Sequence, residues 1–80
     1  MAVKDIVSPV PGTFFRRPSP DRPPYKEVGD PVATGDVIGL VEVMKTFYQV
    51  KSDTAGHVRG FLVDNEGEVQ AGQPLVALEV

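Results

Sequence analysis

One stretch of fourteen residues decides the fold of this chain: Val37-Ile38-Gly39-Leu40-Val41-Glu42-Val43-Met44-Lys45-Thr46-Phe47-Tyr48-Gln49-Val50. It is rich in β-branched and aromatic residues, which favour strands, and it contains no proline, asparagine or aspartate. Because strands in small domains rarely run so long, the chain must reverse its direction somewhere within these residues.

The two halves of the chain resemble each other, and this repeat locates the reversal. A shift of 37 positions places residues 32–43 on residues 69–80, and a shift of 44 places residues 8–12 on residues 52–56. The first unit ends at Val43 and the second begins near residue 51, so we expect a tight turn at Met44-Lys45. The identical pairs are Val32/Val69, Gly35/Gly72, Glu42/Glu79, Val43/Val80, Ser8/Ser52 and Gly12/Gly56.

The spacing of glycine and proline predicts an all-β fold. Eight of each punctuate the chain, and no window sustains a helical apolar period. Two similar β units in so few residues indicate a sandwich with quasi-two-fold symmetry, in which each half covers the apolar face of the other. The second copy is expected to be one residue shorter, at Gly67-Glu68-Val69. The expected strands are 5–7, 13–15, 37–43, 46–50, 58–63 and 75–80.

A proline-rich insert separates the two matched blocks of the first half. Because the two shifts differ, the first half carries roughly seven more residues than the second. Residues 16–24 contain four prolines and no apolar alternation, so they cannot form a central strand. Prolines fix φ in advance, and we expect a stiff projecting loop.

Composition excludes several classes of function. Eight basic and eleven acidic residues give a net charge of −3, which argues against binding to nucleic acid. One histidine, His57, and no cysteine argue against a zinc site or a histidine-based catalytic triad. The sequence has neither a membrane-spanning apolar run nor a signal peptide, so we expect a cytoplasmic protein without a membrane partner. It holds or presents something rather than catalysing a reaction.

Met44-Lys45 is a costly choice for a two-residue hairpin turn. Such turns prefer Asn-Gly or Asp-Gly because their central residues need positive φ, and a left-handed non-glycine residue costs about 1–2 kcal/mol. An unfavourable residue pair at a projecting tip is a place to expect function. The alternative is a solvated lysine on an ordinary loop.

The motif around this turn is similar to that of the biotinyl/lipoyl domain family. Glu42-Val43-Met44-Lys45 resembles the Glu-Ala-Met-Lys signature of biotinyl domains, and the resemblance extends over nearly the whole chain. Residues 12–21 also resemble the entry to the "thumb" of the biotin carboxyl carrier domain of bacterial acetyl-CoA carboxylase. Val43 and Thr46 replace the usual alanine and methionine, and Arg17 stands where the thumb usually has a threonine.

The resemblance implies one biotinyl domain over residues 1–80, with a thumb at about residues 16–24. It implies a flattened barrel or sandwich of two four-stranded antiparallel sheets. Biotin would be bound covalently to Lys45, with Met44 and Glu42 recognised by the ligase and Arg17 contacting biotin from the thumb. The implied partners are biotin protein ligase and the biotin carboxylase and carboxyltransferase subunits of an acetyl-CoA carboxylase, an enzyme of fatty acid biosynthesis. The chain itself would be a non-catalytic carrier.

Two other functions stay open from the sequence. A lipoyl domain of a 2-oxo acid dehydrogenase complex would share the fold, although such domains usually have aspartate before the modified lysine, where this chain has Met44. An unmodified all-β interaction module would bind partners through its proline-rich loop.

Overall fold

The structure is a computed structural model that describes residues 2–80, and these residues form eight strands and no helix. None of the described residues belongs to a helix that could cross a membrane. The strands are β1 (Val3–Val7), β2 (Gly12–Phe15), β3 (Pro31–Val32), β4 (Val37–Val43), β5 (Thr46–Lys51), β6 (Gly56–Phe61), β7 (Gly67–Val69) and β8 (Pro74–Glu79).

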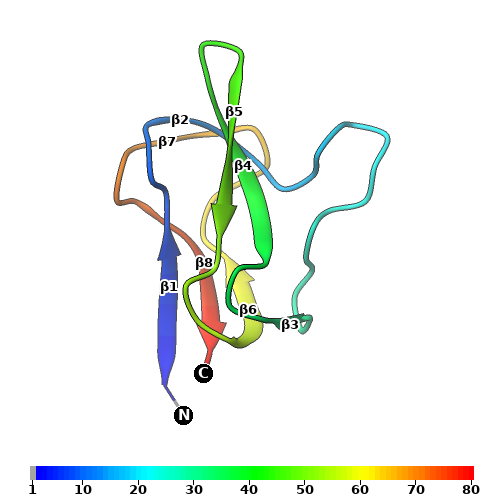
Figure 1. Cartoon of the computed structure of the whole chain (residues 1–80), viewed down its shortest axis with the longest axis vertical. Coiled ribbons are helices and arrows are strands. Elements are labelled where there is room, and N and C mark those ends of the chain that lie inside the picture. The colour runs from blue at the N-terminus through cyan, green and yellow to red at the C-terminus, as the bar shows by residue number, and fades with distance from the viewer. Residues whose placement is uncertain (1) are drawn as a thin grey trace.

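Two antiparallel four-stranded sheets face each other (Figure 1). One has the strand order β1-β8-β6-β3 and the other has the order β5-β4-β2-β7. In the repeat, the strands β1, β8, β6 and β3 correspond to β5, β4, β2 and β7, so the two sheets have equivalent strand orders. The predicted all-β sandwich with quasi-two-fold symmetry is therefore confirmed.

The strand registers confirm the repeat residue by residue. Glu42 pairs with Phe47 and Thr13, whereas its equivalent Glu79 pairs with Val3 and His57. These partners are themselves equivalent, since each differs from its counterpart by the expected shift of 44 positions.

The loops repeat as closely as the strands. Ser8 and Ser52 are buried, and each hydroxyl donates to the carbonyl two residues later, at 2.6 and 2.5 Å. The N–H of Gly72 donates to the Ser8 carbonyl at 2.7 Å, and the N–H of Gly35 donates to the Ser52 carbonyl at 2.8 Å. Through its backbone carbonyl, each serine therefore binds a glycine turn that belongs to the other half of the chain.

One cluster of apolar side chains fills the space between the sheets. β1, β2, β5 and β6 each contribute one residue to it, whereas β4 and β8, which lie inside their sheets, each have four consecutive buried residues. Phe61 is half-buried and packs against this cluster. The buried members are Ile6, Phe14, Val32, Ile38, Val41, Val50, Val58, Val69, Leu75, Val76 and Leu78.

The prediction that the second copy is one residue shorter is wrong. The N–H of Glu66 donates to the Phe14 carbonyl at 2.6 Å, just as the N–H of Gly29 donates to the Val58 carbonyl at 2.8 Å. Glu66 has a φ of 66° and Gly29 a φ of 94°, so Glu66 occupies the left-handed position of Gly29. Comparison of the two halves by sequence aligns Gly67 with Gly29. The backbone instead aligns Gly67 with Asp30, so no residue is missing from the second copy.

Strand limits also differ from those predicted. The strand expected at residues 58–63 is β6, which begins at Gly56 and ends at Phe61. The two-residue β3 and three-residue β7 have too few residues for an apolar alternation, so the sequence pattern missed them.

Candidate functional site

The hairpin between β4 and β5 is the most exposed feature of the fold. Val43 pairs with Thr46, which leaves Met44 and Lys45 as a two-residue turn. Their φ values are 50° and 66°, the positive values that a type I′ turn requires at both central positions. The predicted reversal at Met44-Lys45 is confirmed, with two side chains that the turn itself does not favour.

The turn holds the Lys45 side chain in water. Lys45 is exposed, and Met44 is 93% exposed. The ion pairs of the described residues involve Lys4 and Lys26, and no side-chain hydrogen bond within residues 2–80 involves Lys45. Its amine is therefore available to a reagent or enzyme that approaches the tip.

The body of the sandwich holds this tip away from the chain ends. Figure 1 shows the hairpin projecting from one pole and both termini at the opposite pole. β4 lies between β5 and β2, and its Val41 is fully buried. Since a buried strand leads directly into the turn, the base of the hairpin is fixed while the Lys45 side chain is free.

Glu42 lies one step below the tip. It is half-buried on β4, between Phe47 of β5 and Thr13 of β2. The structure therefore brings three of the predicted residues, Glu42, Met44 and Lys45, onto one hairpin.

The insert between β2 and β3 forms a loop that is closed at its base. The N–H of Tyr25 donates to the Arg16 carbonyl at 2.9 Å, and the N–H of Arg16 donates to Asn65 Oδ1 at 2.8 Å. The Arg16 guanidinium lies 3.8 Å from the centre of the Phe61 ring. These contacts fix the loop to the turn before β7, and the loop projects to the side of the sandwich (Figure 1).

A local network stiffens the far part of this loop. The N–H of Arg22 donates to the Ser19 carbonyl at 3.1 Å, and the Ser19 hydroxyl donates to Asp21 Oδ1 at 2.6 Å. The hydroxyl stabilises the carboxylate and so lowers the pKa of Asp21 from its ordinary value. With the prolines, these bonds make the loop a preformed turn.

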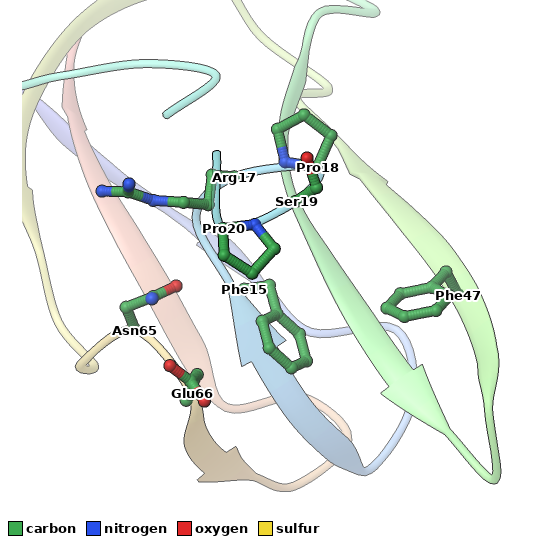
Figure 2. Close-up of a pocket in the computed structure, with 8 residues that line it drawn as sticks. All are labelled: Phe15, Arg17, Pro18, Ser19, Pro20, Phe47, Asn65 and Glu66. Atoms are coloured by element: carbon green, nitrogen blue, oxygen red, sulfur yellow. The ribbon is translucent and has the colours of Figure 1, made fainter. Parts of the chain in front are cut away.

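A pocket of about 530 Å³ lies between the insert loop and the hairpin (Figure 2). The Phe15 and Phe47 rings, 6.1 Å apart and tilted by 58°, form its apolar part. In Figure 2 the polar side chains of Arg17, Asn65 and Glu66 lie on one side of Phe15, and Phe47 lies on the other. The lining residues are Phe15, Arg17, Pro18, Ser19, Pro20, Phe47, Asn65 and Glu66.

Arg17 thus reaches the same pocket as the hairpin strand β5, although it does not belong to the turn. Its Nε and that of Arg16 are buried, and within residues 2–80 neither has a hydrogen-bond partner. Buried donors without a partner cost free energy.

Sequence reasoning missed Phe47, Asn65 and Glu66 as pocket residues. Asn65 and Glu66 precede β7 and come beside the insert only in the folded chain. The repeat contained one signal for Glu66. When the two halves are aligned correctly, Glu66 falls on Gly29, so a glutamate stands where the other half has a glycine with positive φ.

The described residues fit an organic group on a lysine better than a metal ion. No group of three His, Asp or Glu side chains within residues 2–80 is arranged to hold a metal. In contrast, Lys45 is exposed and is followed two residues later by Phe47, which lines a pocket with an apolar part, an arginine and a carboxylate. A ring with polar edges, tethered to Lys45, matches these surfaces in chemistry.

Several known proteins are similar to this chain in sequence. A family model described as "Biotin-requiring enzyme" matches residues 4–78. The biotin carboxyl carrier protein of acetyl-CoA carboxylase from Haemophilus influenzae is 39% identical over 74 residues, which cover 92% of this chain and 48% of that protein. The protein of the same name from Chlamydia muridarum is 43% identical over 70 residues, covering 88% of this chain and 43% of that protein.

A solved structure shares the architecture. The urea carboxylase of Kluyveromyces lactis superposes on 99% of this chain with a TM-score of 0.79 and 26% identity, over 6% of its own length. The chain spans about half the length of the carrier proteins that it matches.

Proposed function

Since this chain belongs to the biotin/lipoyl family, whose model is described as "Biotin-requiring enzyme", we propose that it carries biotin covalently on Lys45. One observation carries the proposal. Met44 and Lys45 are both held at positive φ in a two-residue turn, which places the Lys45 amine at an exposed pole. No stability argument explains that residue pair, whereas presentation of the amine does.

The chain contributes geometry rather than catalysis. Lys45 Nζ forms an amide with the activated carboxyl group of biotin, the activating group leaves, and the lysine loses its positive charge. When bound, biotin accepts a carboxyl group at one active site and releases it at another. The rigid sandwich positions the base of this arm, and the lysine side chain supplies its mobility.

We assign the carrier to a carboxylase of the acetyl-CoA carboxylase type. Relatives that bear this name match about nine-tenths of the chain, which supports the assignment. The partners would be the biotin carboxylase and carboxyltransferase subunits of that enzyme, which serves fatty acid biosynthesis in the cytoplasm. A tethered group meets each active site at an effective concentration set by the reach of its arm.

Glu42 and Met44 are proposed recognition residues for biotin protein ligase. Met44 is 93% exposed immediately before the modified lysine, so a ligase cleft that receives the amine must also receive this side chain. Glu42 is half-buried on β4, so only part of this residue is open to a ligase.

Residues 16–24 are proposed to act as a thumb over the carried biotin. Arg17 supports this, because it lines the pocket next to the hairpin. A guanidinium donates hydrogen bonds to carbonyl and carboxylate oxygens, and the ring end of biotin bears a carbonyl.

Mass and blotting experiments test the site. The protein is expressed in biotin-fed cells, probed with streptavidin and weighed intact. We expect one biotinyl adduct in the wild type and none in Lys45→Arg, because arginine cannot form the amide. As a control, Lys51→Arg removes a different exposed lysine, at the end of β5, and should leave the adduct unchanged. A lipoyl adduct, or biotin retained by Lys45→Arg, would overturn the proposal.

A further inference from the structure

The two halves of the fold provide an internal comparison. Most positions in one sheet have an equivalent in the other, in the same register; the exception is a bulge at Arg59 in β6, which β2 lacks. A residue that the fold itself requires should therefore recur in both halves, as Gly12 and Gly56 do. A residue that differs sharply between the two halves is therefore explained by a requirement other than the fold.

Such differences gather at the pocket beside the hairpin. Phe47, which pairs with Glu42, corresponds to Val3, which pairs with Glu79. Phe15 pairs with Leu40, whereas the shift of 44 places Arg59 on Phe15; Arg59 lies in the bulge of β6, and Gly60 pairs with Ala77. The aromatic part of the pocket has no counterpart on the other sheet, so fold stability does not explain it.

Glu66 is the third difference and the most unfavourable one. Its backbone has a φ of 66°, and the equivalent residue of the first half is Gly29, for which this conformation is free of strain. Glycine at this position would therefore suit the fold better. Instead, the chain holds a carboxylate there, in the wall of the pocket that also contains Arg17 and Asn65 (Figure 2).

We propose that Glu66 is a recognition residue for the ring of the biotin carried on Lys45, and that its carboxylate accepts a hydrogen bond from a ring N–H. The proposal rests on the proposed function. The ring end of biotin is a cyclic urea, which has N–H donors as well as a carbonyl acceptor. Arg17, which also lines the pocket, has guanidinium donors that suit the carbonyl, and Glu66 supplies the acceptor that the N–H groups need.

The site lies within reach of the arm. Phe47 follows Lys45 by two positions, a distance of about 7 Å along a strand, and its ring already lines the pocket. The four-carbon stem of lysine and the aliphatic chain of biotin together exceed this separation, so the arm can fold back and bring the ring to the aromatic part of the pocket.

Hydrogen exchange of the ring N–H groups tests the proposal directly. The biotinylated protein is prepared with ¹⁵N-labelled biotin, and exchange of each ring N–H with water is followed by NMR. In the wild type we expect one N–H to exchange about fivefold more slowly than in free biotin, the factor for an ordinary hydrogen bond. In Glu66→Ala and Glu66→Gly, which remove the acceptor, the rate should return towards that of free biotin.

Two controls make the result specific to Glu66. Glu68→Gln changes an exposed carboxylate of β7 outside the pocket lining and should leave the slowing intact. Glu66→Gly should raise the thermal midpoint of the unbiotinylated protein, because it removes the left-handed glutamate.

The failures are distinguishable. Slow exchange that persists in Glu66→Ala would overturn the role of Glu66. Free-biotin rates in a wild type that carries the adduct would overturn the inference while leaving the carrier function intact. Absence of the adduct would overturn the proposed function as well.

Discussion

Gly12 and Gly56 occupy equivalent positions in the two sheets, each against the backbone carbonyl of a glutamate on the neighbouring strand. A Cβ at Gly12 would overlap the Glu42 carbonyl oxygen, and a Cβ at Gly56 would overlap that of Glu79. Glycine is therefore required twice, because β2 and β6 each approach their neighbour too closely for a side chain.

This relationship predicts a matched pair of destabilising substitutions. Gly12→Ala and Gly56→Ala should each lower the free energy of unfolding by about 2–3 kcal/mol, because a strand must shift to relieve the overlap. Urea denaturation measures the change. Gly60→Ala is the control, since a Cβ there meets no atom within 4 Å. Equal effects at all three glycines would contradict the close approach.

The hairpin turn should be open to stabilisation at the expense of function. Replacing Met44 by Asn and Lys45 by Gly gives the residues that a type I′ turn prefers. We expect the free energy of unfolding to rise by about 1–2 kcal/mol, as left-handed strain is relieved, while streptavidin binding is lost. Denaturation curves that coincide with the wild type would show that the turn stores no strain.

The loop before β4 should respond to acid. The Ala33 N–H donates to Asp36 at 2.9 Å and the Lys26 ammonium lies 3.2 Å away, and together they lower the pKa of Asp36 from its ordinary value of 3.8. The carboxylate is favoured in the folded state, so its stabilisation is present above the unfolded value and is lost as the pH falls through the folded value.

Asp36→Asn therefore should remain folded and lose stability less steeply with acid. Its equivalent, Gln73, already accepts the corresponding bond from the Gln70 N–H at 3.0 Å with a neutral amide. Unfolding curves collected between about pH 5 and pH 2 compare the two slopes. Equal slopes would mean that this carboxylate does not contribute to acid unfolding.

Asn65 should control the order of the insert loop. Its Oδ1 is the acceptor for the Arg16 N–H at the base of the loop. Asn65→Ala should increase amide hydrogen exchange at Arg16 and cost about 1 kcal/mol of stability. Asn65→Asp keeps an acceptor and should preserve the slow exchange; if both variants exchange alike, the bond does not hold the loop.

Much of the architecture was determined by local sequence. Glycine and proline at short intervals, with β-branched runs between them, allow strands and exclude helices, so the all-β class followed from residues that are neighbours in the chain. The repeat placed the turn at Met44-Lys45, because a unit that ends at Val43 must reverse there to begin again. The family signature around Lys45 lies in the same few residues.

The tertiary structure alone decided what depends on contacts between distant residues. β3 and β7 exist because they pair with β6 and β2, since strands so short have no pattern of their own. Glu66 takes the place of Gly29 because its N–H bonds to Phe14, and this corrected the alignment of the repeat. The pocket joins Arg17, Phe47 and Glu66 from three separate parts of the chain, and only the packing of the insert against β5 and the turn before β7 brings them together.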